Sequence, residues 1–333
     1  MKQLFSLLFL LTALPGLHAQ DGRTVPAGDL RSWCTTLSSD EMRGRKNGSP
    51  EMVKAAEFIA AGFREAGLKL VYAETGYIQE YSYADRSGKQ LKERNVIGIL
   101  EGSDPVLKNE WIILSAHFDH IGTGKPVNGD SIYNGADDNA TGTVTVMALA
   151  KMLAASPVRP KRSILFAAFS GEENGAHGSK WFLEHSPVPV DKIRLNLNFE
   201  MEGESATLGK NRYILTGHQF TDFDDLLDRY NKDKGWEVAR TFKSPEWVFL
   251  ASDNATFAVK RDGGNATLNI PAFTVVTTDD ISIIHKVTDE AQNLDYDNMA
   301  GLVSYLNGLV LFLSGDPLDI HWDYEAFKKF TKR

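Results

Sequence analysis

Short apolar segments rich in β-branched residues alternate with amphipathic helical patterns along the chain, and this alternation restricts the fold more than any other feature. The predicted strands and helices lie far enough apart in sequence for strand–helix–strand units. We therefore expect an α/β fold, a three-layer α/β/α sandwich around a mixed, mostly parallel central sheet. The predicted strands are residues 95–100, 111–116, 163–169, 193–199 and 272–277, and the predicted helices between and after them are residues 142–153, 178–184, 220–230 and 298–313.

A further helix is predicted after Ser49, which reads as a capping residue followed by Pro50 in the first turn. Apolar residues then recur at helical spacing until Gly67 ends the pattern. The chain has 333 residues, of which 42% are hydrophobic, so we expect one catalytic domain over residues 20–333. Residues 202–212 and 232–245 read as loops around the site, and the tail after Gly315 reads as a surface extension.

The first 19 residues have the pattern of a secretory signal peptide. Lys2 precedes an apolar run over residues 4–14, and small-residue cleavage near Ala19 would start the mature chain at Gln20. The run is too short for a membrane span, and we expect no later stretch to span a bilayer. The sequence thus predicts a secreted or periplasmic protein.

Charge and cysteine content exclude other classes. The formal net charge is −8, whereas a nucleic-acid-binding protein needs clustered Lys and Arg, so no nucleic-acid partner is expected. Cys34 is the single cysteine, so no internal disulfide forms, and we expect this thiol to have no catalytic role.

Candidate ligands follow the predicted strands. His117 ends one strand, and Asp119, two residues on, can orient its imidazole. A single His-x-Asp also fits a hydrogen-bonded histidine at a strand end, and we interpret the neighbouring His120 as structural. Asp137 and Asp138 share a glycine-bracketed turn, which either caps the next helix or holds a cation that relieves their repulsion.

The paired acids Glu172 and Glu173 form the strongest local signal. They follow a buried strand directly and lie between glycines, so one can bind a metal while its neighbour takes a proton from water. Glu200 follows the next strand, and His285 lies in the loop after the last predicted strand. Open α/β sheets bind ligands at the carboxyl ends of their strands, so we expect these groups to meet there.

Two imidazoles and three carboxylates suit zinc. One bridging carboxylate, with one histidine and one acid for each ion, gives each metal three protein ligands and an open place for water. That is the composition of a catalytic site. The predicted ligands are His117, Asp138, Glu173, Glu200 and His285.

In its ordered motifs the chain resembles the M28 family of co-catalytic di-zinc aminopeptidases. The motifs are His117-x-Asp119, Ala136-Asp137-Asp138-Asn139, Gly171-Glu172-Glu173, Asn198-Phe199-Glu200 and His285. The resemblance implies two Zn²⁺ per chain, one bound by His117 and Glu200, the other by Glu173 and His285, with Asp138 as the bridge. It also implies that Glu172 is the general base, that Asp119 orients His117, and that a peptide loses its N-terminal amino acid.

Several positions depart from the family pattern. Glu200 stands where aspartate is commoner, and Ile284 stands where some relatives place a tyrosine that holds the tetrahedral intermediate. The oxyanion donor is therefore unassigned. Lys286-Val287 replaces the usual Thr-Pro.

Two alternatives stay open beside an exopeptidase. One is a single-zinc glutaminyl-peptide cyclase, which shares the fold and some ligands, and the other is a non-catalytic binding protein on the same scaffold. The full ligand set favours hydrolysis. The sequence leaves open the side-chain specificity, the choice between amino-, carboxy- and dipeptidase activity, and the oligomeric state.

Overall fold

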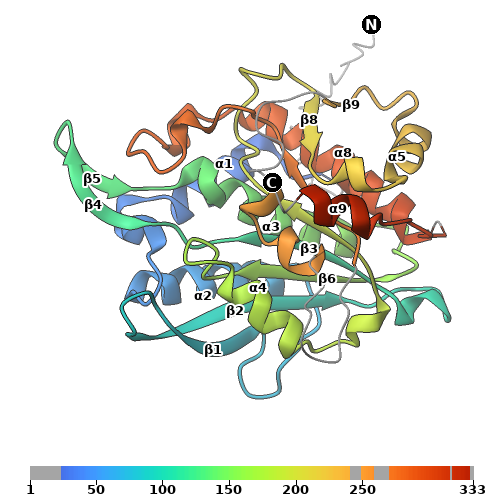
Figure 1. Ribbon diagram of the computed structural model, residues 1–333, viewed down its shortest axis with the longest axis horizontal. Helices are drawn as coiled ribbons and strands as arrows, with labels where there is room; N and C mark the ends of the chain where they lie inside the picture. Colours follow the sequence, from blue (N-terminus) through green and yellow to red (C-terminus); the bar gives the residue numbers. More distant parts are fainter. Residues whose placement is uncertain (1–23, 241–248, 259–269, 316, 331–333) are drawn as a thin grey trace, which may run out of the picture.

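Four parallel strands lie side by side at the centre of an eight-stranded sheet in the computed structural model, which describes residues 24–240, 249–258, 270–315 and 317–330 (Figure 1). The sheet order is β1-β2-β6-β3-β7-β10-β8-β9. The central strands β6, β3, β7 and β10 run parallel, whereas β1, β2 and β8 join through antiparallel pairs. The strands are β1 Ile78–Ala84, β2 Gln90–Leu100, β3 Trp111–His117, β6 Ser163–Phe169, β7 Ile193–Phe199, β8 Arg212–Leu215, β9 Glu237–Val238 and β10 Ala272–Val276.

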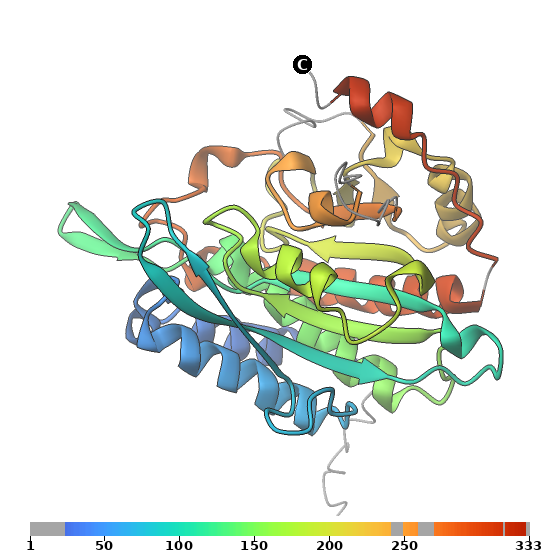
Figure 2. The same cartoon turned by 60° about the horizontal axis from the view of Figure 1, so that its bottom comes forward.

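Helices cover both faces of this sheet (Figure 2). Phe166 in β6 contacts Phe63 of α2 (Pro50–Glu65) on one face, and Phe169 in the same strand contacts Phe182 of α4 (His177–Glu184) on the other. Side chains at an odd spacing in a strand point to opposite faces. Helices α1 (Ala27–Leu37), α3 (Gly142–Ala155) and α8 (Tyr296–Gly315) pack together, and α7 (Asn254–Ala258) packs beside α4. The predicted three-layer sandwich is confirmed.

The buried central strands and the N-terminal helix were predicted closely. β6 and β7 have the predicted bounds, and α2 begins after Ser49, whose hydroxyl accepts a hydrogen bond from Met52 N at 3.4 Å. Helix α1 was not predicted, and neither were strands β1, β4 (Gly122–Val127), β5 (Asp130–Tyr133), β8 and β9. These strands are exposed, short or at the edge, so they lack the continuous apolar run that marks a buried strand.

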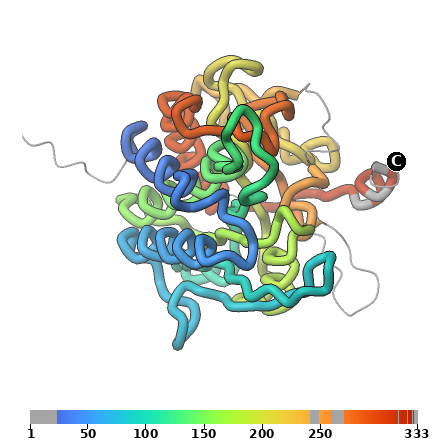
Figure 3. The backbone as a smooth tube through the Cα atoms, turned by 90° about the vertical axis from the view of Figure 1, so that its left-hand side faces the viewer, coloured from blue at the N-terminus to red at the C-terminus, as the bar shows by residue number. Residues whose placement is uncertain are grey.

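The C-terminal tail differs from the predicted surface extension. After Gly315 the chain forms α9 (Tyr324–Phe330), which lies at the periphery on the opposite side from α1 and α2 (Figure 3). Trp322 and Phe327 are nonetheless buried, and both rings contact Phe220 at centroid distances of 5.8 and 5.4 Å. The predicted helix over 220–230 begins later than expected, as α5 (Phe223–Asn231), because residues 218–220 form a separate 3₁₀ turn.

Helix α8 corrects one expectation about membranes. It has 20 residues with a mean hydropathy of 1.3, so by length and composition alone it is sufficient to cross a bilayer. Much of it, including Leu302, Leu306 and Val310, is buried against the rest of the protein. A buried core helix passes the same test, so the absence of a membrane span stays a prediction.

Cys34 lies inside the core as a free thiol and contacts the carbonyl oxygen of Ala136 at 3.6 Å. Burial raises the pKa of this thiol to about 12. A buried protonated thiol is a poor nucleophile, which agrees with the expected lack of a catalytic role.

Gly142 at the start of α3 lies close to the end of β7. A Cβ at this position would lie 2.2 Å from the Phe199 carbonyl oxygen and 2.5 Å from Asn139 Oδ1. Gly28 in α1 is a matched control, because a Cβ there meets nothing within 4 Å.

We predict that Gly142→Ala lowers the free energy of unfolding by about 1–3 kcal/mol, because the helix must move away from β7. Gly28→Ala should leave the stability unchanged or raise it by up to about 1 kcal/mol, because alanine favours a helix. Urea unfolding of both variants measures the difference. Equal midpoints for the two variants would contradict the close approach.

Candidate metal centre

The carboxyl ends of the central parallel strands bring the candidate residues to one edge of the sheet. His117 is the last residue of β3 and pairs with Phe169 at the end of β6, so the Glu172–Glu173 turn begins beside it. Glu200 follows β7 directly. The β4–β5 hairpin leaves this edge after β3 and returns through a distorted turn over Ala136–Thr141, which carries Asp138. The expected convergence at the strand ends is observed.

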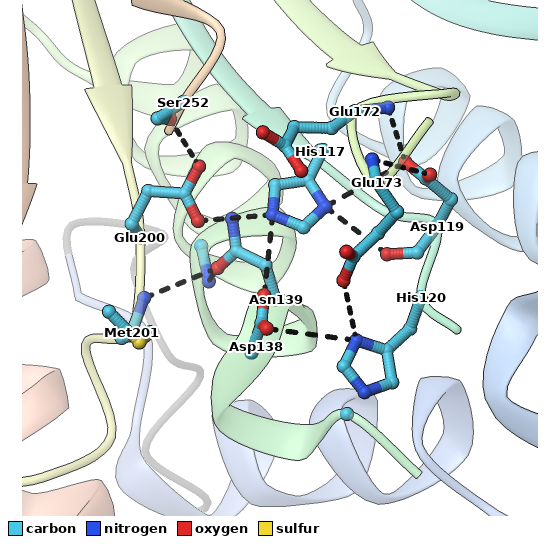
Figure 4. A network of polar contacts seen from close by, with 12 residues as sticks. His117, Asp119, His120, Asp138, Asn139, Glu172, Glu173, Glu200, Met201 and Ser252 are labelled. Atoms are coloured by element: carbon cyan, nitrogen blue, oxygen red, sulfur yellow. Dashed lines mark hydrogen bonds and ion pairs between the residues drawn. The ribbon is translucent and has the colours of Figure 1, made fainter. Parts of the chain in front are cut away.

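One group of possible metal ligands consists of His117, Asp138 and Glu200 (Figure 4). His117 Nε2 lies 3.1 Å from Glu200 Oε2 and 3.4 Å from Asp138 Oδ1. The other oxygen of Glu200 accepts hydrogen bonds from Ser252 Oγ and, at 3.2 Å, from Asn198 Nδ2. Glu200 therefore reaches the imidazole although it is one methylene longer than the aspartate of the resemblance.

A second group shares Asp138 with the first. It contains Glu173, His285 and also His120, and its possible ligand atoms lie within 4.8 Å of one another. His285 Nε2 lies 2.9 Å from Glu173 Oε2 and 3.5 Å from Asp138 Oδ2. Figure 4 shows Asp138 between His117 and Glu200 on one side and Glu173 and His120 on the other. All five predicted ligands are brought together, and sequence reasoning had not placed His120 beside them.

Neighbouring imidazoles favour the ionised forms of Asp138 and Glu173. Burial alone would raise the pKa of Glu173, but contacts with His120 and His285 hold it well below its usual range. Burial likewise opposes ionisation of Asp138, and His117 lowers the pKa of Asp138. Burial disfavours the charged form of His117, but Glu200 and Asp119 raise its pKa above the usual value. Metal ligands must be deprotonated carboxylates and neutral imidazoles, so a cation would take the place of the imidazole protons.

Asp119 has a wider role than the predicted orientation of His117. His117 Nδ1 lies 3.1 Å from the main-chain oxygen of Asp119 and 3.7 Å from its carboxylate. Donation from Nδ1 to the carbonyl leaves the Nε2 lone pair facing Asp138 and Glu200. The Asp119 carboxylate accepts the main-chain N–H groups of Glu172 at 3.2 Å and Glu173 at 3.3 Å. Asp119 thus also holds the turn that presents both glutamates.

Glu172 faces the same space without contributing to either group of ligands. It lines a cavity of about 550 Å³ together with His117, Glu173 and Glu200. Burial raises the pKa of Glu172 well above its usual range, and the Asp253 and Glu200 carboxylates reinforce the shift. A carboxyl group with a raised pKa beside candidate metal ligands is suited to general acid–base chemistry.

Buried Arg45 fixes the main chain around the cluster. Its guanidinium donates to the carbonyl oxygens of Leu37, Phe118, Asn134 and Gly135, each at 2.7 Å. These contacts join the end of α1, the end of β3 and the turn before Asp138. Four of the five N–H donors of Arg45 therefore bind carbonyl oxygens.

Asp289, which sequence reasoning missed, couples two loops of the site. Its carboxylate accepts the main-chain N–H of Asp137 at 2.7 Å and that of Asp138 at 3.0 Å. Because Asp289 lies four residues after His285, it ties the His285 loop to the Asp138 turn. In the sequence, Asp289 was marked only by its position near the candidate ligand His285. That position does not indicate a hydrogen bond to Asp137 and Asp138, which are distant in sequence.

The donor set fits a pair of divalent cations. Three carboxylates and three imidazoles lie within reach of two positions that share Asp138, and nitrogen and oxygen donors of this kind suit zinc. Neither ring nitrogen of His120 has a hydrogen-bond partner among the described residues, as expected for a donor that faces a cation.

We predict that Asp289→Ala lowers the free energy of unfolding by about 1–3 kcal/mol for each N–H group that it leaves unsatisfied. Asp289→Asn retains one acceptor oxygen and should recover part of this loss. Asp191→Ala is the control, because the Asp191 side chain is 76% exposed. Denaturant unfolding of the three variants measures the order of their stabilities. An Asp289→Ala variant as stable as the control would refute the coupling between the loops.

Solved structures of other proteins share this fold. In the solved structure of BSAP, a zinc aminopeptidase from Bacillus subtilis, the same fold covers 86% of this chain and 95% of that chain, with a TM-score of 0.66 and 14% identity. Porphyromonas gingivalis glutaminyl cyclase gives a TM-score of 0.67 at 14% identity, over 87% of this chain and 98% of that one. At these identities the likeness concerns the fold alone.

Sequence relatives extend the comparison. A probable leucine aminopeptidase 2 from Aspergillus oryzae is 30% identical over 41% of this chain and 25% of its own length. Leucine aminopeptidase 2 of Trichophyton equinum is 23% identical over 66% of this chain. The chain spans less than half the length of these curated relatives. The sequence model of peptidase family M28 matches residues 95–307, and the chain belongs to this family.

Proposed function

We propose that the chain is a zinc-dependent exopeptidase that releases N-terminal amino acids from peptides. The observation that carries this proposal is one cavity lined by two groups of metal ligands that share Asp138, with the carboxyl group of Glu172 facing the same space. This arrangement corresponds to a two-metal hydrolytic site with a separate base.

We propose two zinc sites per chain. His117, Asp138 and Glu200 would hold one ion, and Asp138, Glu173 and His285 would hold the other. Zinc bound there supplies a Lewis acid that lowers the pKa of water to about 7 and polarises a carbonyl group. The protein contributes the fixed positions of these side chains through Asp119, Ser252 and Asp289.

Glu172 moves the proton in this proposal. Its carboxylate accepts a proton from the attacking water and then donates it to the leaving amine nitrogen of the peptide. Because burial raises the pKa of this carboxyl group, its carboxylate is a stronger proton acceptor than an exposed one. No covalent enzyme intermediate is needed, because the water attacks the scissile carbonyl carbon directly.

The cavity walls favour an apolar residue at the cleavage position. Met201, Leu250 and Ile284 line the space beside the candidate ligands. Burying an apolar side chain against them stabilises binding in proportion to the area removed from water. Ile284 has no hydroxyl group, so its side chain cannot donate a hydrogen bond to the tetrahedral intermediate.

A glutaminyl-peptide cyclase is the second candidate, and the fold shared with known glutaminyl cyclases supports it. A single zinc would need only one of the two groups. The complete first group, with Glu200 held by Ser252 and Asn198, favours the two-metal hydrolase.

The remaining sequence expectations form part of the proposal. Residues 1–19, predicted to be a signal peptide, lie outside the described residues, and their pattern supports export to the periplasm or outside the cell. We further propose that residues 20–333 act as one catalytic domain. The main apolar core extends from Val25 to Phe327, which supports this organisation.

Metal removal by a chelator should abolish turnover and lower the midpoint of thermal unfolding. Ligands that bind only the folded state stabilise it by about 4 kcal/mol when their free concentration is ~1,000 times the dissociation constant. Calorimetry and elemental analysis before and after chelation measure the effect, and added Zn²⁺ should restore both properties. An unchanged midpoint and unchanged turnover would contradict a metal centre.

Glu172→Gln should keep both metals and lose roughly 1,000-fold in turnover, within the range of general acid–base help. Glu57→Gln, on the exposed face of α2, is the matched control. Turnover and zinc content are measured on each variant. Near-normal turnover in Glu172→Gln would remove Glu172 from the mechanism.

Amino-acyl p-nitroanilides with a free amino group should be cleaved, and their N-acetylated counterparts should not. Apolar residues should be preferred, because Met201, Leu250 and Ile284 line part of the cavity. A peptide with N-terminal glutamine, followed by mass spectrometry, tests for the loss of ammonia. Cyclisation without cleavage of any anilide would favour the cyclase, and cleavage of blocked substrates alone would exclude an aminopeptidase.

A further inference from the structure

His120 is a buried imidazole with no hydrogen-bond partner among the described residues. Only 1% of the residue is exposed, and neither Nδ1 nor Nε2 forms a hydrogen bond there. Its main-chain N–H donates to the carbonyl oxygen of Arg45 at 3.1 Å, so its backbone is fixed. A buried polar group normally has a partner, and its absence requires an explanation.

The ring of His120 approaches the same two carboxylates as His285. His120 Nδ1 lies 3.0 Å from Glu173 Oε1 and 3.8 Å from Asp138 Oδ2, as Figure 4 shows. The two imidazole rings lie 5.4 Å apart between centroids at an angle of 69°. His120 and His285 therefore flank one space, which Asp138 and Glu173 also face.

An ion pair with Glu173 accounts for only part of this position. His120 Nδ1 and Glu173 Oε1 lie 3.0 Å apart, but the two groups are not aligned as in a regular hydrogen bond. An imidazole nitrogen bonds along a direction in the plane of its ring, towards either a hydrogen-bond partner or a metal ion. The short distance without a hydrogen bond fits two ligands that converge on a common cation.

We propose that His120 is a further protein ligand of the second metal ion, in addition to Asp138, Glu173 and His285. This inference rests on the proposed function, because it assumes that the cluster binds zinc. The second site then has four protein ligands, whereas the first has three in His117, Asp138 and Glu200. Four protein ligands complete a tetrahedral zinc site, and three leave a place for water.

The unequal ligand sets have two consequences. The second site binds zinc more tightly and fills first. The open place would belong to the first ion, because three protein ligands leave room for water and four complete a tetrahedral site. The ligands of both ions except His120 line the cavity that Glu172 also lines, and the second ion would neutralise Asp138 and Glu173 there.

The direct test uses the mature full-length protein, labelled with ¹⁵N-histidine and loaded with ¹¹³Cd²⁺. We expect three imidazoles to show scalar coupling between ¹⁵N and ¹¹³Cd, from His117, His120 and His285. The His120→Gln variant identifies one of them. Two coupled imidazoles in the wild-type protein would overturn the proposal, and this count does not depend on the folding of any variant.

Zinc affinity supplies the second measurement. In His120→Ala, the dissociation constant of the tighter binding step should rise more than ~100-fold, beyond the roughly 10- to 100-fold effect of removing a group that only hydrogen-bonds a ligand. The weaker step should change little. His218→Ala is the control, because His218 pairs with Asp224 outside the metal centre. A smaller rise would leave His120 as a positioning residue and overturn its role as a ligand.

The outcomes separate this inference from the proposed function. A protein that takes up neither Cd²⁺ nor Zn²⁺ would refute the proposed metallopeptidase itself. A protein that binds two ions through only two imidazoles would refute the role of His120 and leave the peptidase proposal standing.

Discussion

Mutual repulsion between carboxylates at one edge of the sheet is the constraint on which the site depends. Asp138, Glu173 and Glu200 lie within a few ångströms of three imidazoles and are largely removed from water. Charges in such a place are costly unless opposite charges compensate them. Without metal, the neighbouring imidazoles supply part of this compensation, since contacts with His120 and His285 lower the pKa of Glu173 and Glu200 raises the pKa of His117. Divalent cations provide the same compensation more completely and fix the ligands in space.

Hydrogen bonds to the main chain hold the loops that carry these carboxylates in place. Arg45 binds four carbonyl oxygens around the strand end and the Asp138 turn, and Asp289 binds two N–H groups of that turn. Asn139 adds a bond from its Nδ2 to the Phe199 carbonyl oxygen at 2.8 Å, which joins the turn to β7. The turn that carries the shared ligand is therefore held from three directions. Its position does not depend on the ligand contacts alone.

The apolar core sets the geometry at a larger scale. Strand β6 buries every residue from Ser163 to Phe169, because α2 and α3 cover one face and α4 and α7 the other. Parallel strands buried on both faces end at a common edge, where helices begin and loops can carry polar groups. The charged cluster lies at this edge, where the core ends and the cavity opens.

The sequence alone determined the layered fold, the buried central strands and the residues that follow their carboxyl ends. These features are local: an apolar run, a glycine-bracketed turn and a pair of acids each leave a pattern within a few residues. Only the tertiary structure showed which residues from distant segments are in contact. Asp289 and Asp138 are far apart in the chain, and His120 meets Glu173 and His285 only because the Glu172–Glu173 turn and the His285 loop fold back onto β3. Hydrogen bonding and burial at these residues depend on neighbours in space that are distant in sequence. Local sequence patterns do not reveal such neighbours.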